Sequence, residues 1–400
     1  MSMIIKQQYS KKQVLIIFVL LFLTSSLYGF IFTMNFFTRS FFLCMALVAL
    51  VIYFKSKKNK EFLQSVFYKE FCFLYLWSLV PALTTIFFGG SFLDEFLNGL
   101  AFSFTAVVYP AFYKYRVTEK TIIIAFALFS IIATIIQIMI QLHPELAFFG
   151  AQSEEDIVWG MRNGLYRVRP GCIQMTVFLG LFYWCEISKK IDIYSLVMFA
   201  FMFTGMYLEL TRQIYLGFAV AILYTVFWGR NSKVNYRILF LVCVLAVIAI
   251  YKYWDVLFAS MVSSYKEDTF TTDIRQKCMS FTFSQLLDNP ILSFFGHGHL
   301  EVERLVWWVK YHYFMSDIGF VGEAFYKGFF WIYVYFKMIY MLLFKYRKQV
   351  PLYVKAFVVA TGVISMSIFP YSYPISLFVW SSMLYISSLY IKRKEYAYKK

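Results

Sequence analysis

The chain has 400 residues, of which 61% are hydrophobic and only 15% are charged, and its formal net charge is +16. Soluble globular proteins carry about 25% charged residues, and a soluble core of this size could not hide so many Phe, Ile and Leu side chains. The composition therefore argues against soluble domains and predicts that lipid solvates much of the surface.

Apolar runs of about 17–25 residues are long enough to cross a bilayer as helices. The sequence predicts an all-α polytopic membrane protein with about 12 transmembrane helices, forming one membrane domain over residues 1–400. In chain order the predicted spans are 14–32, 36–54, 71–88, 96–113, 121–142, 170–188, 192–209, 213–229, 237–254, 318–344, 353–370 and 374–391. Pro81 interrupts the third span, and the first lacks a small-residue cleavage site, so it is expected to be an uncleaved anchor.

Basic residues gather on one side of this predicted arrangement. If the connections alternate between the two sides, starting inside, the inside segments hold 25 of the 38 Lys and Arg residues and six acidic residues. The positive-inside rule then predicts that both termini are cytoplasmic. Because these bases are scattered over seven segments rather than forming one groove, no nucleic-acid partner is expected.

Two predicted external connections are long: residues 143–169, and residues 255–317 between the ninth and tenth helices. Loops of this length without structure of their own are usually functional or disordered. Both are rich in Trp, Tyr and Phe, which argues against disorder. The functional site is therefore expected in these loops, on the outer face.

Three arginines close the first long loop: Arg162, Arg167 and Arg169, the last directly before Pro170. Pro170 suits the first turn of the next helix. Helix N-termini attract anions, and a guanidinium group can clamp a phosphate with two hydrogen bonds. The three arginines are thus candidate phosphate ligands; the alternative is that they reach lipid headgroups or pair with nearby acidic residues.

Two further arginines are candidates for the same role. Arg212 lies in the short connection between the seventh and eighth helices, where it either faces an anionic substrate or pairs with Glu209. Arg275 begins a short helix that is predicted to lie on the membrane surface within the large loop.

The large loop also holds three of the four histidines. His297 and His299 form a His-x-His pair without fixed acidic partners, and the cysteines show no metal-binding spacing, so no metal is expected. His312 is the candidate general base, with Asp317 as the residue that orients it; the alternative is a structural, hydrogen-bonded histidine.

Two tryptophans and two lysines in this part of the sequence can be explained by a structural role as well as by a functional one. Trp307 and Trp308 suit either a membrane-interface belt or stacking on a sugar. Lys327 and Lys337 fall inside the tenth span and need partners there, and Glu323 is placed to pair with Lys327.

The order of these motifs resembles the O-antigen polymerase/ligase family of bacterial membrane glycosyltransferases, the Wzy-type polymerases among them. The matching stretches are Arg167-Val-Arg-Pro-Gly, Leu210-Thr-Arg212, Arg275 followed by Asp288-Asn-Pro-Ile-Leu-Ser-Phe-Phe-Gly296-His-Gly298, and His312 with Ser316-Asp-Ile-Gly-x-x-Gly322. The resemblance covers about Leu165 to Tyr340. Some members carry a glycine sixteen positions after an arginine, where this chain has Cys185 and Ile291.

The resemblance implies a multi-pass enzyme of the bacterial inner membrane that joins oligosaccharide repeat units carried on polyprenyl diphosphate, for O-antigen or a related surface polysaccharide. It implies membrane lipid and a chain-length regulator protein as partners, and neither a metal nor another cofactor. Arg169, Arg212 and Arg275 would stabilise the charge that grows on the leaving diphosphate.

Two alternatives stay open. One is an O-antigen ligase that transfers the glycan to lipid A–core. The other is a transporter of polysaccharide or lipid-linked sugar, a class that commonly shows repeated halves with broken helices; no such symmetry is found in the sequence.

Overall fold

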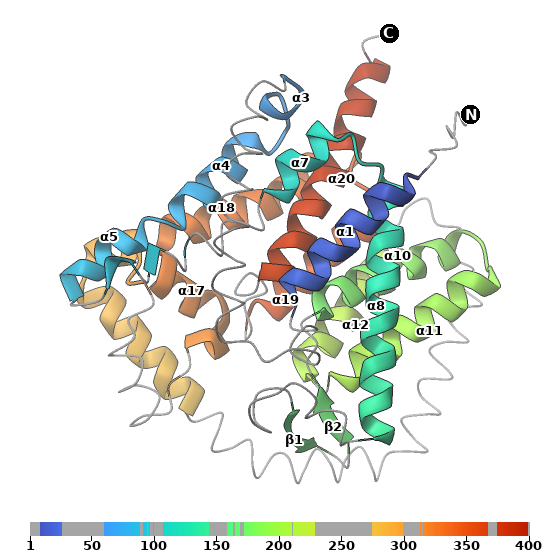
Figure 1. The fold of residues 1–400 in the computed structure, drawn as a ribbon. Helices are drawn as coiled ribbons and strands as arrows, with labels where there is room; N and C mark the ends of the chain where they lie inside the picture. Colours follow the sequence, from blue (N-terminus) through green and yellow to red (C-terminus); the bar gives the residue numbers. More distant parts are fainter. Residues whose placement is uncertain are drawn as a thin grey trace.

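The fold is known from a computed structural model. It describes residues 9–25, 60–88, 91–93, 95–96, 99, 107–143, 158–162, 165–168, 172–209, 211–228, 274–298, 313, 315–366 and 374–398. These residues are mostly helical (Figure 1), which agrees with the predicted helical class. The number of spans and their orientation in the membrane stay predictions.

Most helices follow the predicted spans where both are described, but the helix predicted at 14–32 ends at Thr24 and the helix predicted at 353–370 ends at Ile364. The first half contains α1 (Lys11–Thr24), α3 (Lys60–Leu63), α4 (Tyr68–Trp77), α5 (Pro81–Thr85), the 3₁₀ turn η2 (Ile86–Phe88), α7 (Val108–Lys114) and α8 (Glu119–Leu142). The second half contains α10 (Ile173–Lys189), α11 (Ile193–Leu208), α12 (Arg212–Trp228), an unlabelled helix over residues 274–288, α15 (Pro290–Phe295), the 3₁₀ turn η4 (Met315–Ile318), α17 (Gly319–Lys327), α18 (Phe329–Tyr340), the π-helix η5 (Met341–Lys345), α19 (Leu352–Ile364) and α20 (Pro374–Tyr398). The predicted spans 36–54 and 237–254 lie outside the described residues.

Within the described residues, α8 and the segment Ile375–Lys392 of α20 are long and apolar enough to cross a membrane. Shorter apolar helices are Ile193–Leu208, Gln213–Trp228 and Leu352–Ile364. The start of α8 shows how sequence sets such an element: the hydroxyl of Thr118 accepts a hydrogen bond from the amide of Thr121 and caps the helix. A mostly apolar run, with Ser130, Thr134, Gln137 and Gln141 as its polar residues, then extends the helix to Leu142.

Helix α10 lies at the centre of the bundle, in contact with α8, α11, α12, α19 and α20. Its side chains are buried on nearly every face. Phe178, for example, meets Phe126 of α8 and Phe357 of α19 with their rings edge to face. A helix that is apolar all round belongs in the interior of a large helical assembly.

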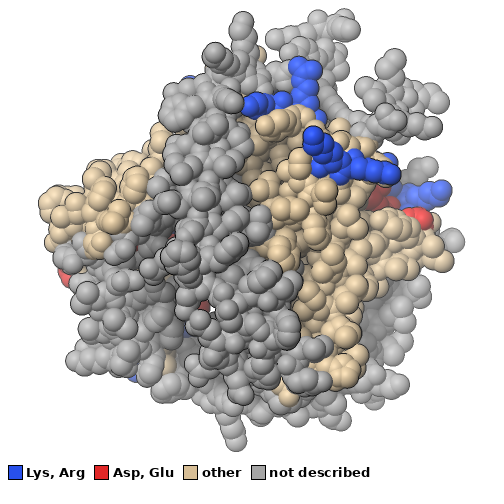
Figure 2. Space-filling model, viewed as in Figure 1, with Lys and Arg blue, Asp and Glu red and all other residues tan. Residues whose placement is uncertain are grey.

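The start of α1 and the end of α20 lie at the same end of the molecule (Figure 1). Lys and Arg side chains gather at this end, while the described surface below them in this view shows mostly other residues (Figure 2). Lys120 lies over the ring of Tyr9 at 5.3 Å, and the amide of Gln13 donates to the carbonyl of Tyr115. The start of α1 and the end of α20 therefore lie at one basic end of the described structure; the side of the membrane that this end faces stays a prediction.

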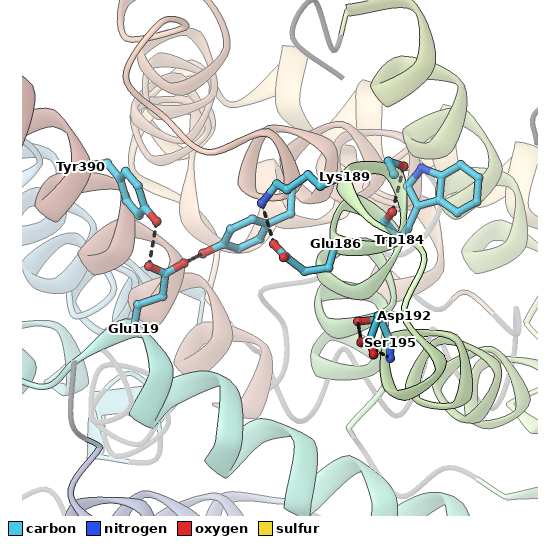
Figure 3. A network of polar contacts seen from close by, with 9 residues as sticks. Glu119, Trp184, Glu186, Lys189, Asp192, Ser195 and Tyr390 are labelled. Atoms are coloured by element: carbon cyan, nitrogen blue, oxygen red, sulfur yellow. Dashed lines mark hydrogen bonds and ion pairs between the residues drawn. The ribbon is translucent and has the colours of Figure 1, made fainter. Parts of the chain in front are cut away.

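A carboxylate at the same end ties three helices together (Figure 3). Glu119 of α8 accepts a hydrogen bond from the hydroxyl of Tyr353 of α19 at 2.6 Å and another from that of Tyr390 of α20 at 2.8 Å. Both oxygens of this carboxylate therefore hold defined protein partners, which fixes the ends of α8, α19 and α20 to one another.

The predicted third and tenth spans are both interrupted. Residues 78–80 form a turn between α4 and α5, which confirms the predicted break at Pro81. The tenth span was expected to run unbroken over 318–344, but it divides at Gly328, whose φ is +83°. A Cβ at Gly328 would overlap the carbonyl of Phe294, so glycine is needed there for both conformation and space.

The predicted loop 143–169 contains an antiparallel hairpin, which the all-α expectation missed. Strands β1 (Val158–Arg162) and β2 (Leu165–Val168) pair with Val158 opposite Val168 and Arg162 opposite Leu165. Valine, tryptophan and tyrosine in these segments favour strands. The hairpin lies beside the C-terminal end of α8, at the end of the molecule opposite the start of α1 (Figure 1). Following the predicted topology, this end, with the hairpin and the helix over residues 274–288, is called the outer end.

Candidate functional site

The predicted site residues are described to different extents. Five of them, Arg169, His299, Trp307, Trp308 and His312, lie outside the described residues. For Arg162, Arg167 and Arg212 the structure describes the backbone but not the side chain. Arg275, Asp317 and His297 are described with their side chains.

Arg275 and Asp317 form an ion pair at the outer end. The guanidinium nitrogen Nη2 of Arg275 lies 3.6 Å from Oδ2 of Asp317, and both side chains are roughly half exposed, at 43% and 45%. Asp317 was predicted as the partner of His312; the described contact is with Arg275. Residues 42 positions apart carry no periodic signal, so the sequence could not reveal this pair.

An apolar cluster beneath the ion pair holds its two segments together. The helix over residues 274–288 packs on η4 and α17 through six buried side chains: Cys278, Leu286, Met315, Ile318, Val321 and Phe325. The cluster fixes the helix that carries Arg275 against the turn that carries Asp317. Burial of these apolar groups, at about 25 cal/mol per Å², stabilises the contact far more than the exposed ion pair, since exposed pairs contribute only about 0–1 kcal/mol.

The segment Gly296-His297-Gly298 is held by its backbone between α5 and α17. The hydroxyls of Thr84 and Thr85 donate to the carbonyls of Gly296 and His297, at 2.5 and 3.0 Å. From the other side, the amide of His297 donates to the carbonyl of Phe325 at 2.7 Å. The glycine-rich motif therefore joins the third-span region to α17 and leads the chain away from α15.

His297 itself is enclosed. Its side chain is 3% exposed and its ring stacks on that of Phe325, with centroids 4.2 Å apart and planes inclined by 10°. Burial lowers the pKa of His297 to about 4, so the imidazole is neutral near pH 7. This environment favours a packing role over that of a general base. Among the residues that the structure describes, no three His, Cys, Asp or Glu side chains form a group that could hold a metal ion.

The two lysines of the tenth span have carboxylate partners. Lys327 pairs with Glu323 at 2.9 Å, as the sequence predicts, and both side chains are buried. Lys337 pairs with Glu70 of α4, also at 2.9 Å. This partner could not be predicted from the sequence, because the two residues are far apart in the chain. Both pairs stabilise charges that would otherwise be costly inside a membrane.

Two glutamines of α8 bind the segments that carry the other arginines. The side chain of Gln141 donates to the carbonyl of Tyr166 at 2.6 Å and accepts from its amide at 2.9 Å. One turn earlier, Gln137 donates to Oε2 of Glu209 at 3.3 Å. Tyr166 directly precedes Arg167, and Glu209 precedes the first residue of α12, Arg212, by three positions. Sequence reasoning missed both glutamines, because each resembles an isolated polar residue in an apolar span.

The outer end thus combines an apolar helical bundle with segments that carry arginines and with a half-exposed ion pair. Residues 197–330 match a family model described as O-antigen ligase. This match includes Arg212, Arg275, His312 and Asp317, and it confirms the resemblance to the O-antigen polymerase/ligase family. The family consists of bacterial membrane proteins of the glycosyltransferase type and implies a lipid-linked oligosaccharide as substrate. No curated protein and no solved structure matches the chain.

Proposed function

We propose that the protein joins oligosaccharide repeat units carried on polyprenyl diphosphate, at the outer face of the bacterial inner membrane. The family match over residues 197–330 supports glycan transfer by an enzyme of this kind. The observation that carries the proposal is the half-exposed guanidinium of Arg275, held by Asp317 within the matched segment. A cation in this position is accessible to a diphosphate group and is already oriented by a carboxylate.

The reaction breaks one bond and forms another at the same carbon. A hydroxyl of the acceptor sugar attacks the anomeric carbon of the donor glycan, and the bond from that carbon to the lipid diphosphate breaks. The diphosphate leaves with the electron pair, so negative charge grows on its oxygens in the transition state. Fixed guanidinium groups stabilise that charge, and this is the role we assign to Arg169, Arg212 and Arg275.

The hydroxyl must also lose its proton. We assign its removal to His312, because an imidazole titrates near neutral pH and suits general base catalysis. Asp317 lies five residues after His312 and pairs with Arg275. It therefore links the segment of the proposed base to the segment of the proposed diphosphate ligand, in addition to the orienting role that the sequence suggests.

Arg162 and Arg167 are secondary candidates for the diphosphate, and His299, Trp307 and Trp308 for contacts with sugar. The hairpin places the backbone of Arg162 next to that of Leu165, close to Arg167. Tryptophan rings in the large loop suit stacking on the apolar faces of sugars.

Transfer to lipid A–core is the second candidate, because the matching family model is described as O-antigen ligase. The two reactions share the donor and differ in the acceptor. We favour polymerisation because the Ser316-Asp-Ile-Gly-x-x-Gly322 stretch resembles the polymerases more closely.

Deletion of the gene from its host separates these candidates. Loss of a polymerase leaves a single repeat unit on the core, whereas loss of a ligase leaves no repeat unit at all. Complementation with Arg169→Ala or His312→Ala is expected to fail at normal protein levels, while Lys120→Ala, at the opposite end of the molecule, is expected to restore the wild-type polysaccharide. Unchanged long-chain polysaccharide in the deletion strain would refute both glycan-transfer assignments.

A further inference from the structure

The C-terminal half of α8 places two primary amides on one face. Gln137 and Gln141 are four residues apart, so their side chains lie one above the other, about 5–6 Å apart at Cβ. Gln137 is almost fully buried, at 1% exposure. In an apolar transmembrane helix, a buried amide is retained only where it has polar partners, and both of these glutamines have them.

The side chain of Gln141 binds the backbone of the hairpin, as a neighbouring strand would. Its amide group both donates to and accepts from the backbone of Tyr166, at 2.6 and 2.9 Å. Two hydrogen bonds to one residue fix the position of β2 along α8 and also its rotation. Arg167 is the next residue, and Arg169 follows just beyond the end of β2.

Gln137 binds the connection between α11 and α12 through a hydrogen bond to Glu209. Glu209 ends α11 and is 5% exposed, and its carboxylate accepts the hydrogen bond from Gln137 at 3.3 Å. The close approach of the two helices depends on Gly205, one turn before Glu209. A Cβ at Gly205 would overlap the hydroxyl of Thr134 on α8. The sequence thus brings α11 near enough for Glu209 to reach Gln137, three residues before Arg212.

We propose that Gln137 and Gln141 are positioning residues that hold the two arginine-bearing segments of the lipid diphosphate site against one face of α8. This inference rests on the proposed function. The ligand class is a polyprenyl diphosphate. The segments are residues 166–168, which carry Arg167, and residues 211–212, which follow Glu209 and carry Arg212. Without the two amides, each segment would sample several positions, and the arginines would have to be ordered when the diphosphate binds, which weakens affinity.

Binding of undecaprenyl diphosphate to the purified full-length protein in detergent tests this directly. Gln141→Leu and Gln137→Leu are each expected to weaken binding by about tenfold, which corresponds to about 1.4 kcal/mol. The matched control is Gln174→Leu. Gln174 is a buried glutamine of α10 whose Oε1 accepts no hydrogen bond within the described part of the chain. The Gln174→Leu variant is therefore expected to bind undecaprenyl diphosphate with the affinity of the wild type.

A paired substitution separates positioning from a general loss of stability. Gln137→Glu combined with Glu209→Gln exchanges donor and acceptor across the same contact and keeps the charge, so it is expected to restore binding. If Gln141→Leu does not fold, Gln141→Glu replaces it. The carboxylate keeps an acceptor for the amide of Tyr166 and loses the donor, so weaker binding is again expected.

The outcomes distinguish the two proposals. Wild-type affinity in the folded Leu or Glu variants would overturn the positioning role and leave the proposed function standing. Failure of the wild-type protein to bind undecaprenyl diphosphate would overturn both. Equal weakening by Gln174→Leu, or no recovery in the paired substitution, would show that the two amides act only through stability and would overturn the positioning role.

Discussion

The two ends of the molecule use carboxylates in different ways. At the end where α1 begins, Glu119 accepts hydrogen bonds of 2.6 and 2.8 Å from two tyrosines on two other helices. At the outer end, Asp317 lies 3.6 Å from a half-exposed guanidinium. The hydrogen bonds of Glu119 are short and are made to protein groups. The ion pair of Asp317 is longer, and both of its side chains are partly exposed.

This difference indicates a division of roles. Each oxygen of Glu119 accepts a hydrogen bond from a tyrosine of another helix, so this carboxylate serves to hold helices together. An exposed ion pair contributes little to stability, and its cation can exchange one anion for another. The outer end is therefore where a charged substrate can compete for protein contacts, and the following changes test that contrast.

The largest effect is expected at Gly328, on which the geometry of the outer end depends. Gly328→Ala introduces a Cβ at a φ of +83° and into the carbonyl of Phe294, which should destabilise the protein by about 3 kcal/mol or more. Thermal unfolding in detergent measures this. The control is Gly362→Ala in α19, where a Cβ meets no atom within 4 Å; it should be neutral or stabilising by up to about 1 kcal/mol. Equal melting temperatures for the two variants would contradict the packing described.

Glu119→Leu should have the next largest effect on stability. It leaves the hydroxyls of Tyr353 and Tyr390 without their acceptor, at a cost of about 1–3 kcal/mol. Because Glu119 lies at the end opposite the proposed site, glycan transfer per folded molecule should be unchanged. A variant with normal stability but defective transfer would reverse the roles assigned to the two ends.

Asp317→Asn should impair glycan transfer and leave stability nearly unchanged, the opposite of Glu119→Leu. Loss of an exposed ion pair changes stability by less than about 1 kcal/mol, but the guanidinium of Arg275 loses its orienting charge. We expect shorter surface polysaccharide at normal protein level and melting temperature, read from the chain-length pattern of cells that carry the variant. Wild-type chain length would show that the ion pair has no part in transfer.

The smallest effect at neutral pH is that of the charge state of His297, which changes stability only as the pH falls below about 6.5. Its pKa in the folded protein is about 4 against an ordinary value of 6.5, because burial disfavours the charged form. Between these values the unfolded chain binds a proton that the folded protein does not, so His297 lowers stability as pH falls from 6.5 to 4. His297→Leu should remove this part of the pH dependence, measured as the difference in unfolding between variant and wild type. Parallel pH profiles for the two proteins would contradict the buried, neutral imidazole.

Much of the fold follows from the sequence because apolar length and the capping signals are local. The span predicted at 121–142 corresponds to α8, and Pro81 marks the break between α4 and α5. The break at Gly328 was missed, since it depends on the close approach of residues 294–296, which lie more than thirty positions earlier. The hairpin was missed because its strands are short, and its position depends on a side chain of α8.

The candidate site, like the fold, is partly predictable from the sequence. Candidate arginines and histidines can be found from their placement in predicted outer loops, and the pair Glu323 and Lys327 from its helical spacing. Partners that come from other helices carry no such spacing: Asp317 with Arg275, Glu70 with Lys337, and Glu209 with Gln137. Such contacts arise only when the helices pack, so a single sequence does not reveal them.

The central claim is that a guanidinium at the outer end acts on the lipid diphosphate, and Arg275 offers the most direct test. Arg275→Ala should be compared with Lys277→Ala, which removes an exposed cation two residues later on the same helix. In a deletion strain, we expect Arg275→Ala to lower polymer formation by about a hundredfold or more and Lys277→Ala to support normal chain lengths, with both proteins present at equal levels. Normal polysaccharide with Arg275→Ala would contradict the account.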